Sequence, residues 1–342
     1  MPYLPLRRRW FALALLAALV PTPVPSRAAA APLRPAPPVR AAVSRLTVTV
    51  LSTMLAGNPN RGIGEWGYAA LIEVDGARYL FDTGARPDVV LHNARELGID
   101  LATVTDVILS HNHGDHTGGL LTLRRAVMGT RREALSRVHV ARGIFWVRPD
   151  NGTDGGGTDG NGLRDTRAAY EATGGTFIEH DGPVELMPGV WFTGPVPRPF
   201  AERNWSGRGT VVTPAGTVED TVPEDASVVI NTASGLVVVS GCGHSGIINT
   251  VTYARQVVRA APIHAAIGGF HLFAATDQQL QWTAAQLKGV GLAYLLAGHC
   301  TGIEATYRLR DLAGLTRKTA VVSAVGSSFT LGQGLTPLSL AQ

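Results

Sequence analysis

The sequence repeats one local plan four times: an apolar run, then small or polar residues, then histidine. The copies are VTDVILSHNHGDH (104–116), GLVVVSGCGH (235–244), IHAAIGGFH (263–271) and AYLLAGHC (293–300), and they hold seven of the ten histidines. Helical spacing separates the last three copies, in INTVTYARQVV and TDQQLQWTAAQL. Strands that alternate with helices form parallel or mixed sheets, with functional groups at the carboxyl ends of the strands. The pattern predicts an α/β fold whose histidines meet at a sheet edge.

The stretch before the first copy predicts further strands and a helix. LTVTVL, YAALIEV and ARYLFDTG have β character, and Asp75-Gly76 between the last two is a hairpin signal. PDVVLHNARELGI (87–99) has helical spacing, and another helix is expected from near Gly118 through LLTLRRAV. We therefore expect a hairpin followed by alternating helices and strands.

Residues 1–30 predict a cleavable signal peptide. Arg7, Arg8 and Arg9 precede a short apolar run, which is followed by prolines and alanines. The Arg8-Arg9 pair also permits the twin-arginine route. The apolar run is shorter than the about 20 residues that span a bilayer. The sequence thus predicts a periplasmic or secreted protein, with a Pro/Ala-rich linker at 31–44 and no membrane span after cleavage.

The charge of the remaining chain is balanced. The whole sequence has 30 basic and 26 acidic side chains, but four of the arginines and none of the acids fall within residues 1–30. A neutral surface offers no basic stripe for phosphate backbones. We therefore expect a small-molecule substrate and no nucleic-acid partner.

The region at about 143–225 differs from its surroundings. DNGTDGGGTDGNG (150–162) is of low complexity, and several prolines follow in PGVWFTGPVPRPFAERNW. We interpret this region as a flexible insert or flap within one domain that covers residues 45–335.

The motif His111-x-His113-x-Asp115-His116 is the most specific signal. Residues i and i+2 of an extended segment point the same way, so His111 and His113 can bind one ion together. The turn at Gly114 lets Asp115 and His116 reach a second position. Imidazole and carboxylate ligands suit zinc, and they also serve iron and manganese. The motif predicts one or two divalent metal ions.

Further ligands are expected from the later copies of the plan. His244, His271 and His299 each follow an apolar strand, and His271 could equally face a substrate. Cys242 is open to three interpretations: a bridging thiolate, a buried apolar side chain, or one half of a disulfide with Cys300.

Three more polar residues are candidates for supporting roles. Asp82, at the end of the strand in LFDTG, can accept an imidazole N–H and so orient a metal ligand. Arg198 and Glu202, in GPVPRPFAERN, are candidate contacts to a polar substrate.

Together these motifs resemble the metallo-β-lactamase superfamily. FDTG, SHNHGDHTGG, SGCGHSGIINT, GGFHL and GHCTG carry the resemblance over about residues 46–330. They resemble in particular the branch named for 7,8-dihydropterin-6-methyl-4-(β-D-ribofuranosyl)aminobenzene 5′-phosphate synthase. The resemblance implies an αββα sandwich, with two mixed sheets, helices on the outer faces and a metal pair at one edge.

The resemblance also implies a division of the ligands. His111 and His113 would belong to one metal, Asp115 and His116 to the other, and His299 matches the last histidine of the fold. The superfamily usually has a bridging aspartate after a late strand, where this chain has Gly241-Cys242-Gly243-His244. Cys242, His244 or His271 would have to take that place.

The metal chemistry predicts a hydrolase, and the signal peptide predicts that it is exported. A bound ion lowers the pKa of water to about 7, and the metal-bound hydroxide would attack an ester, lactone, amide or phosphoester. Asp115 is the expected group to orient the water and carry its proton. The branch name implies an alternative, the condensation of a pterin diphosphate with an aminobenzene ribose phosphate. A third interpretation is a metal or ligand binder without catalytic activity.

Overall fold

The computed structural model describes residues 42–149, 160–205 and 209–341. The predicted signal peptide, most of the linker at 31–44 and most of the low-complexity stretch at 150–162 lie outside the described residues. The account below concerns the compact unit from residue 42 onward.

The first half of the unit is built on a mixed sheet that is eight-stranded in the described part of the chain. Its outer strands at one side are antiparallel, whereas β3, β4, β5 and β6 run parallel. In spatial order the strands are β17 (Gly334–Thr336), β16 (Ser328–Thr330), β1 (Leu46–Ser52), β2 (Ala69–Val74), β3 (Ala77–Phe81), β4 (Asp106–Ile108), β5 (Arg137–Ala141) and β6 (Thr176–His180).

The second half is built on another mixed sheet, seven-stranded within the described ranges. Here β12, β13, β14 and β15 run parallel, and the remaining neighbours pair antiparallel. In spatial order the strands are β15 (Ala320–Val322), β14 (Tyr294–Ala297), β13 (Ile263–Gly268), β12 (Gly235–Ser240), β11 (Ser227–Thr232), β8 (Val190–Phe192) and β7 (Val184–Met187).

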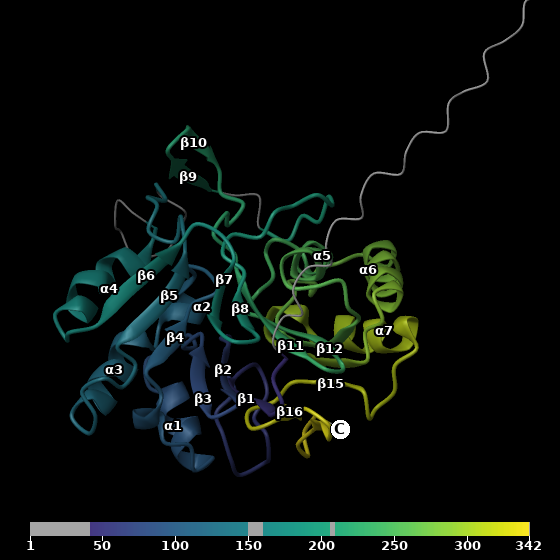
Figure 1. Ribbon diagram of the computed structural model, residues 1–342, viewed down its shortest axis with the longest axis horizontal. Coiled ribbons are helices and arrows are strands. Elements are labelled where there is room, and N and C mark those ends of the chain that lie inside the picture. The colour runs from purple at the N-terminus through teal and green to yellow at the C-terminus, as the bar shows by residue number, and fades with distance from the viewer. Residues whose placement is uncertain (1–41, 150–159, 206–208, 342) are drawn as a thin grey trace, which may run out of the picture. The chain divides into compact units, whose positions relative to one another are not determined.

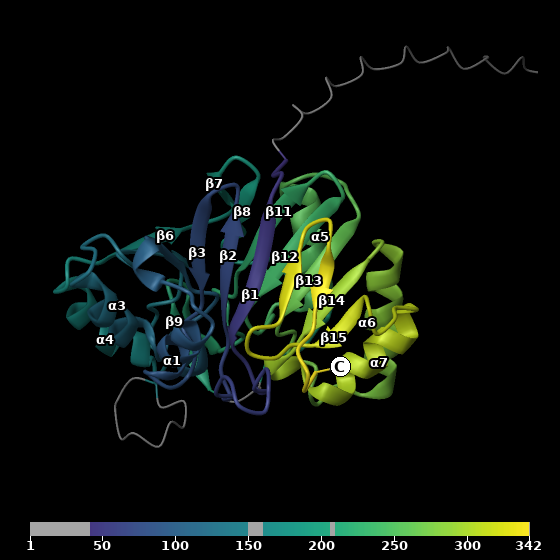
Figure 2. The same cartoon turned by 90° about the horizontal axis from the view of Figure 1, so that it is seen from below.

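Helices cover the outer face of each sheet, as Figure 2 shows. The first sheet carries α1 (Val89–Glu96), α3 (Leu120–Met128) and α4 (Gly162–Glu171), together with the short α2 (Gly114–Thr117) and the 3₁₀ turn Leu101–Thr103. The second carries α5 (Ile247–Val257), α6 (Asp277–Gly289) and α7 (Ile303–Ala313), with a 3₁₀ turn at His299–Thr301.

Three apolar cores hold the four layers together. Because neighbouring side chains of a strand point to opposite faces, the continuous apolar runs are buried on both sides. Ile72 of β2 and Val237 of β12 enter the core between the sheets. Leu71 enters the core beneath the helices of the first half, and Val238 enters the core beneath those of the second. The αββα sandwich predicted from the sequence is confirmed.

The hairpin expected at Asp75-Gly76 joins β2 to β3. Val74 pairs with Ala77, so the loop has two residues, and both have positive φ, +45° at Asp75 and +93° at Gly76. This is the backbone of a tight hairpin turn whose twist matches that of the strands, and Asp-Gly is one of its preferred pairs.

The region at 143–225 contributes to both large sheets. It contains α4 and β6 of the first half and β7 and β8 of the second. The hairpin of β9 (Thr210–Thr213) and β10 (Gly216–Glu219) forms a separate two-stranded sheet, which stands apart from the sandwich in Figure 1. Most of the region's regular structure is therefore part of the sandwich, and the movement of a flap stays a prediction. None of the helices in the described residues combines the length and apolarity needed to cross a membrane.

Candidate metal centre

The predicted ligands leave the carboxyl ends of strands from both sheets. Residues 111–116 follow β4, Cys242 and His244 follow β12, His271 follows β13 and His299 follows β14. Parallel pairing aligns the last three strands, with Ser240 opposite Gly268 and Gly268 opposite Ala297. Segments far apart in the sequence therefore end at one edge of the sandwich.

A first cluster consists of His111, His113 and His244. Their ligand atoms all lie within 4.8 Å of one another. The Nδ1 of His111 lies 2.9 Å from Ser110 Oγ, and the Nδ1 of His244 lies 2.5 Å from the main-chain oxygen of Asn204. Both contacts leave Nε2 free to face the cluster.

A second cluster consists of Asp115, His116, Cys242 and His299. The Nε2 of His116 lies 3.2 Å from Cys242 Sγ and 3.1 Å from His299 Nε2. Asp115 Oδ2 lies 3.3 Å from His299 Nε2. Nitrogen, oxygen and sulfur donors thus converge from two sheets.

Cys242 also groups with His244 and His271, again with all ligand atoms within 4.8 Å. Its sulfur consequently lies between the two clusters. Among the three residues that the sequence left open for the usual bridging position, the geometry favours Cys242. His244 lies with the first cluster, and His271 lies at its margin. Cys242 and Cys300 are buried free thiols, so the alternative of a disulfide between them is not formed here.

Several buried nitrogens test whether a cation fits. His111 Nε2 and His244 Nε2 have no hydrogen-bond partner among the described residues, and the same holds for His271 Nδ1 and His299 Nδ1. Buried polar atoms are rarely left without a partner. A divalent cation would satisfy the first two directly, and the donor set of imidazole, carboxylate and thiol suits zinc. The residues fit a metal pair.

Asp82 contacts one predicted ligand directly and a second one through Ser110. Its carboxylate accepts the His116 Nδ1–H at 2.7 Å and the Ser110 hydroxyl at 2.8 Å, and Ser110 Oγ in turn accepts from His111. It also accepts the Ser110 main-chain N–H at 2.7 Å. This network holds both rings with Nε2 toward the clusters.

Left-handed backbone places three of these residues. Asp82, His271 and His299 have φ of +56°, +48° and +47°. Such values are uncommon outside glycine, although Asp and His tolerate them better than most side chains. Asp82 directly follows β3, His299 comes two residues after the end of β14, and His271 comes three residues after the end of β13, so each lies in the turn that leaves its strand.

Burial sets the protonation of the first cluster. Loss of solvent lowers the pKa of His113 to about 4 and the pKa of His111 and His244 well below the ordinary value. These imidazoles are neutral at neutral pH, the form that binds metals. Burial also raises the pKa of the Cys242 thiol, so binding of a cation by its sulfur must release a proton.

A cavity of about 460 Å³, hereafter the metal cavity, lies over the two clusters. Trp66 and Phe273 line it, both more than half exposed, with their rings edge to face at 5.9 Å. Arg148 lines it as well, and its buried guanidinium pairs with Asp220 at 2.8 Å and with Glu224 at 2.6 Å. The cavity thus has an apolar rim and one fixed buried cation on its wall.

The sequence did not point to Trp66, Arg148 or Asp220. The partners of Arg148 are 72 and 76 residues away along the chain, so no local pattern marks them. One lining residue could have been found from the sequence. Asn112 lies between the predicted ligands His111 and His113, and it also lines the metal cavity.

Arg198 and Glu202 do not line the metal cavity. Arg198 donates to the main-chain oxygen of Val222 at 2.8 Å. The Glu202 carboxylate accepts the main-chain N–H groups of Ile248 at 3.2 Å and Asn249 at 2.8 Å, so it caps the first turn of α5. Both contacts are structural, and a role in substrate binding stays a prediction.

Comparison with known proteins agrees with this geometry. Residues 67–176 match the family model described as metallo-beta-lactamase superfamily. A solved structure described as a metal-dependent hydrolase of the beta-lactamase superfamily superposes with a TM-score of 0.64 at 25% identity, covering 83% of this chain and 98% of that one. The chain therefore carries a metallo-β-lactamase superfamily domain.

Within that class, the chain resembles two further proteins. It is 29% identical over 271 residues to 7,8-dihydropterin-6-methyl-4-(β-D-ribofuranosyl)-aminobenzene-5′-phosphate synthase of Methanocaldococcus jannaschii, covering 77% of this chain and 90% of the relative. A shorter match, 45% over 51 residues, is to the anti-Pycsar protein Apyc1 of Saccharibacillus brassicae, with 15% of this chain and 20% of that protein covered.

Proposed function

We propose that this protein is a metal-dependent hydrolase that cleaves an ester, lactone, amide or phosphoester bond in a small molecule. The observation that carries the proposal is the pair of donor clusters, joined by the Cys242 sulfur, beneath the metal cavity. Side chains that only stabilise the fold would not leave several buried nitrogens without partners at such a place.

The two clusters assign the ligands. His111, His113 and His244 would hold one ion, and Asp115, His116 and His299 would hold the other. Cys242 would contribute its thiolate to both. The mixture of imidazole, carboxylate and thiolate favours zinc, with iron and manganese as alternatives.

A bound ion of this kind supplies Lewis acidity and lowers the pKa of water to about 7. The side chains of the protein would position the reacting water beside the substrate. Asp115 is the one member of its cluster that keeps appreciable exposure, 21% of its side chain, and it lines the metal cavity. Its carboxylate can orient a water molecule and accept its proton. Trp66 and Phe273 form an aromatic pair in the lining of the metal cavity.

The likeness to the hydrolase structure supports this reaction class, and the likeness to the synthase favours a second candidate. In that candidate the same centre would bind the diphosphate of a pterin substrate and promote its condensation with an aminobenzene ribose phosphate. We also propose export to the periplasm or the medium, on the strength of residues 1–30. Sequencing the amino terminus of the exported protein tests that point directly.

One set of assays separates the two reactions. Purified enzyme is offered p-nitrophenyl esters, lactones and bis(p-nitrophenyl) phosphate, with and without added zinc or manganese, and a dihydropterin diphosphate with an aminobenzene partner. Metal-dependent release of p-nitrophenol or opening of a lactone, lost in His113→Ala, supports the hydrolase. Consumption of the pterin diphosphate with none of these hydrolyses supports the synthase and overturns the first proposal.

A further inference from the structure

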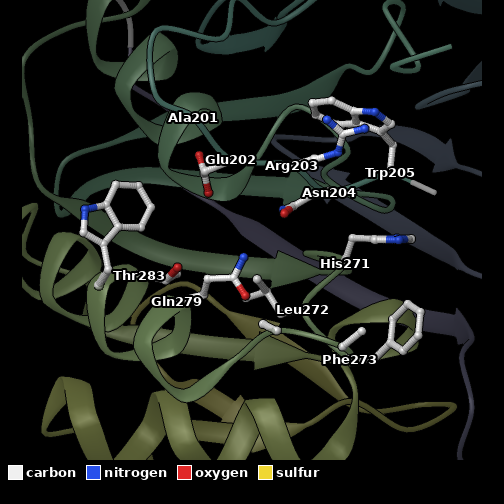
Figure 3. Close-up of a pocket in the computed structure, with 13 residues that line it drawn as sticks. Ala201, Glu202, Arg203, Asn204, Trp205, His271, Leu272, Phe273, Gln279 and Thr283 are labelled. Carbon is white, nitrogen blue, oxygen red and sulfur yellow. The ribbon is translucent and has the colours of Figure 1, made fainter. Parts of the chain in front are cut away.

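A second cavity adjoins the metal cavity. It measures about 260 Å³ and lies between the loop at residues 201–205, the loop after β13 and the first turns of α6 (Figure 3). We call it the side chamber. Trp205, His271 and Phe273 line both cavities, so the two share a wall. The side chamber and the metal cavity therefore adjoin at these three side chains.

Aromatic rings form much of the wall of the side chamber. Phe273 is 55% exposed and Trp282 is 37% exposed, although both border a hollow. Trp205 is fixed in place, because the guanidinium groups of Arg198 and Arg203 lie 5.1 Å and 5.2 Å from its ring and its indole N–H donates to Glu219. Ring walls of this kind favour another flat ring, edge to face or offset-stacked.

Polar groups line the remaining wall, and one of them has a defined direction. The Gln279 carbonyl oxygen accepts from the Thr276 main-chain N–H at 2.7 Å, which turns its amide nitrogen the other way. In Figure 3 that nitrogen points into the side chamber. Gln279 therefore offers an N–H donor to a ligand. The Thr283 side chain lies on the same wall.

Two buried residues of this wall have defined partners, and one of them contacts the metal centre. The Asn204 side chain donates to the main-chain oxygens of Gly243 and Phe270, while its own main-chain oxygen meets His244. Glu202 lies beside it with its carboxylate held by the start of α5. Because burial raises the pKa of Glu202 to about 7, its carboxyl group is partly protonated near neutrality and can itself donate.

We propose that the side chamber binds a planar aromatic or heteroaromatic group that bears a hydrogen-bond acceptor, and that this group belongs to the molecule whose reacting bond lies in the metal cavity. The second half of this statement rests on the function proposed above. The size of the chamber agrees, because whole ligands occupy pockets of about 300–1,000 Å³ and this one is smaller. It suits a single ring system, with the rest of the substrate lying over the clusters.

The test uses two amides of the same size that differ in ring type, benzamide and cyclohexanecarboxamide. Their binding to the full-length, metal-loaded protein is followed by saturation-transfer NMR and titration. We expect benzamide to bind about 3- to 10-fold more tightly, since aromatic pairs contribute about 0.5–1.5 kcal/mol. Equal binding of the two amides overturns the proposal.

A variant that fills the side chamber locates the binding. Ala201 is exposed and lines the chamber, so Ala201→Trp is expected to fold normally and to weaken benzamide binding by about tenfold or more. Ala215→Trp is the matched control, because Ala215 is also exposed but lies in the turn between β9 and β10. Unchanged binding in Ala201→Trp overturns the proposal.

This experiment separates the side chamber from the proposed reaction, because binding needs no turnover. If benzamide is preferred and Ala201→Trp removes the preference while no ester, lactone or phosphoester is hydrolysed, the aromatic site stands and the hydrolase proposal falls. If hydrolysis depends on metal but neither amide is preferred, the opposite holds.

Discussion

The two halves of the metal centre supply similar side chains by different means. The first half places its donors in one stretch, residues 111–116, directly after β4. The second half takes its donors from three loops after three strands: Cys242, His244, His271 and His299. The first set is ordered mainly by local backbone, whereas the second exists only because β12, β13 and β14 pair in a particular register. A dense motif and a dispersed one can therefore form a single site.

The hydrogen-bond partners that orient the donors also differ between the two halves. In the first half, Asp82 and the adjacent Ser110 orient both His111 and His116. In the second half, His244 is oriented from residue 204, and the His299 main-chain N–H donates to a hydroxyl 246 residues away along the chain. The dispersed half should thus be the more sensitive to distant substitutions.

The largest effects are expected from removing one ligand in each half. His113→Ala and His299→Ala should each release one of two ions and lower kcat/KM by more than the about 10- to 100-fold that loss of a ligand's hydrogen-bond partner costs. Elemental analysis and steady-state kinetics measure both. His92→Ala, at an exposed histidine on α1, is the control. If His299→Ala kept both ions and full activity, the dispersed half would not be part of a metal site.

Cys242 joins the two halves, and its substitution tests that connection. The cobalt-loaded protein should show a near-ultraviolet thiolate-to-metal band, which disappears in Cys242→Asp and Cys242→Ala. Aspartate should keep both ions, because a carboxylate can also bridge, whereas alanine should lower metal affinity by about 100-fold or more. Cys300→Ala should keep the band. A band that survives in Cys242→Ala would assign the sulfur ligand elsewhere.

Asp82→Asn tests the support of the dense half alone. Asparagine tolerates the left-handed backbone at this position but cannot hold the His116 N–H as a carboxylate does. We expect metal affinity to fall by about 10- to 100-fold. Ser110→Ala should have a smaller effect, because Asp82 would still orient His116. Competition with a chromogenic chelator gives both values, and equal losses would show that the Ser110 hydroxyl matters as much as the Asp82 carboxylate.

The last prediction concerns the stability of the fold around the dispersed half, and it involves neither metal binding nor turnover. Burial raises the pKa of Glu202 to about 7, although the hydrogen bonds from the main chain of α5 act in the opposite direction. The folded state therefore retains a proton that the unfolded chain releases above about pH 4.5. Stability should therefore fall as pH rises from about 4.5 to 7, by up to about 3 kcal/mol. In Glu202→Gln this dependence should vanish. Urea unfolding of both proteins at pH 5 and pH 8 measures the change, and parallel curves would contradict it.

Much of the fold followed from the sequence. The apolar runs and their spacing predicted β1, β2, β3, β12, β13 and β14 and the helices between the later strands, since strands buried on both faces leave a continuous apolar pattern. The prolines of 183–199 hid β7 and β8, which are short members of the second sheet. Pairing with neighbouring strands places β7 and β8 in the sheet, although their local composition favours loops.

The two halves of the site also differ in how far the sequence predicted them. Residues 111–116 were found from their own pattern, because the motif itself encodes ligand spacing. Choosing among Cys242, His244 and His271 required the register of three strands and the path of each loop, which no local pattern contains. Arg148 and Trp66 were not predicted for the same reason, because their places in the cavity lining depend on the folded chain.

The left-handed backbone at Asp82, His271 and His299 has a consequence for protein engineering. Each such residue costs of the order of 1–3 kcal/mol, which the surrounding scaffold must sustain. Grafting the donor side chains onto another protein with ordinary strand ends would aim the imidazoles away from the intended centre. A transplanted version would need to copy these three turns together with the side chains, and it would need a host with stability to spare.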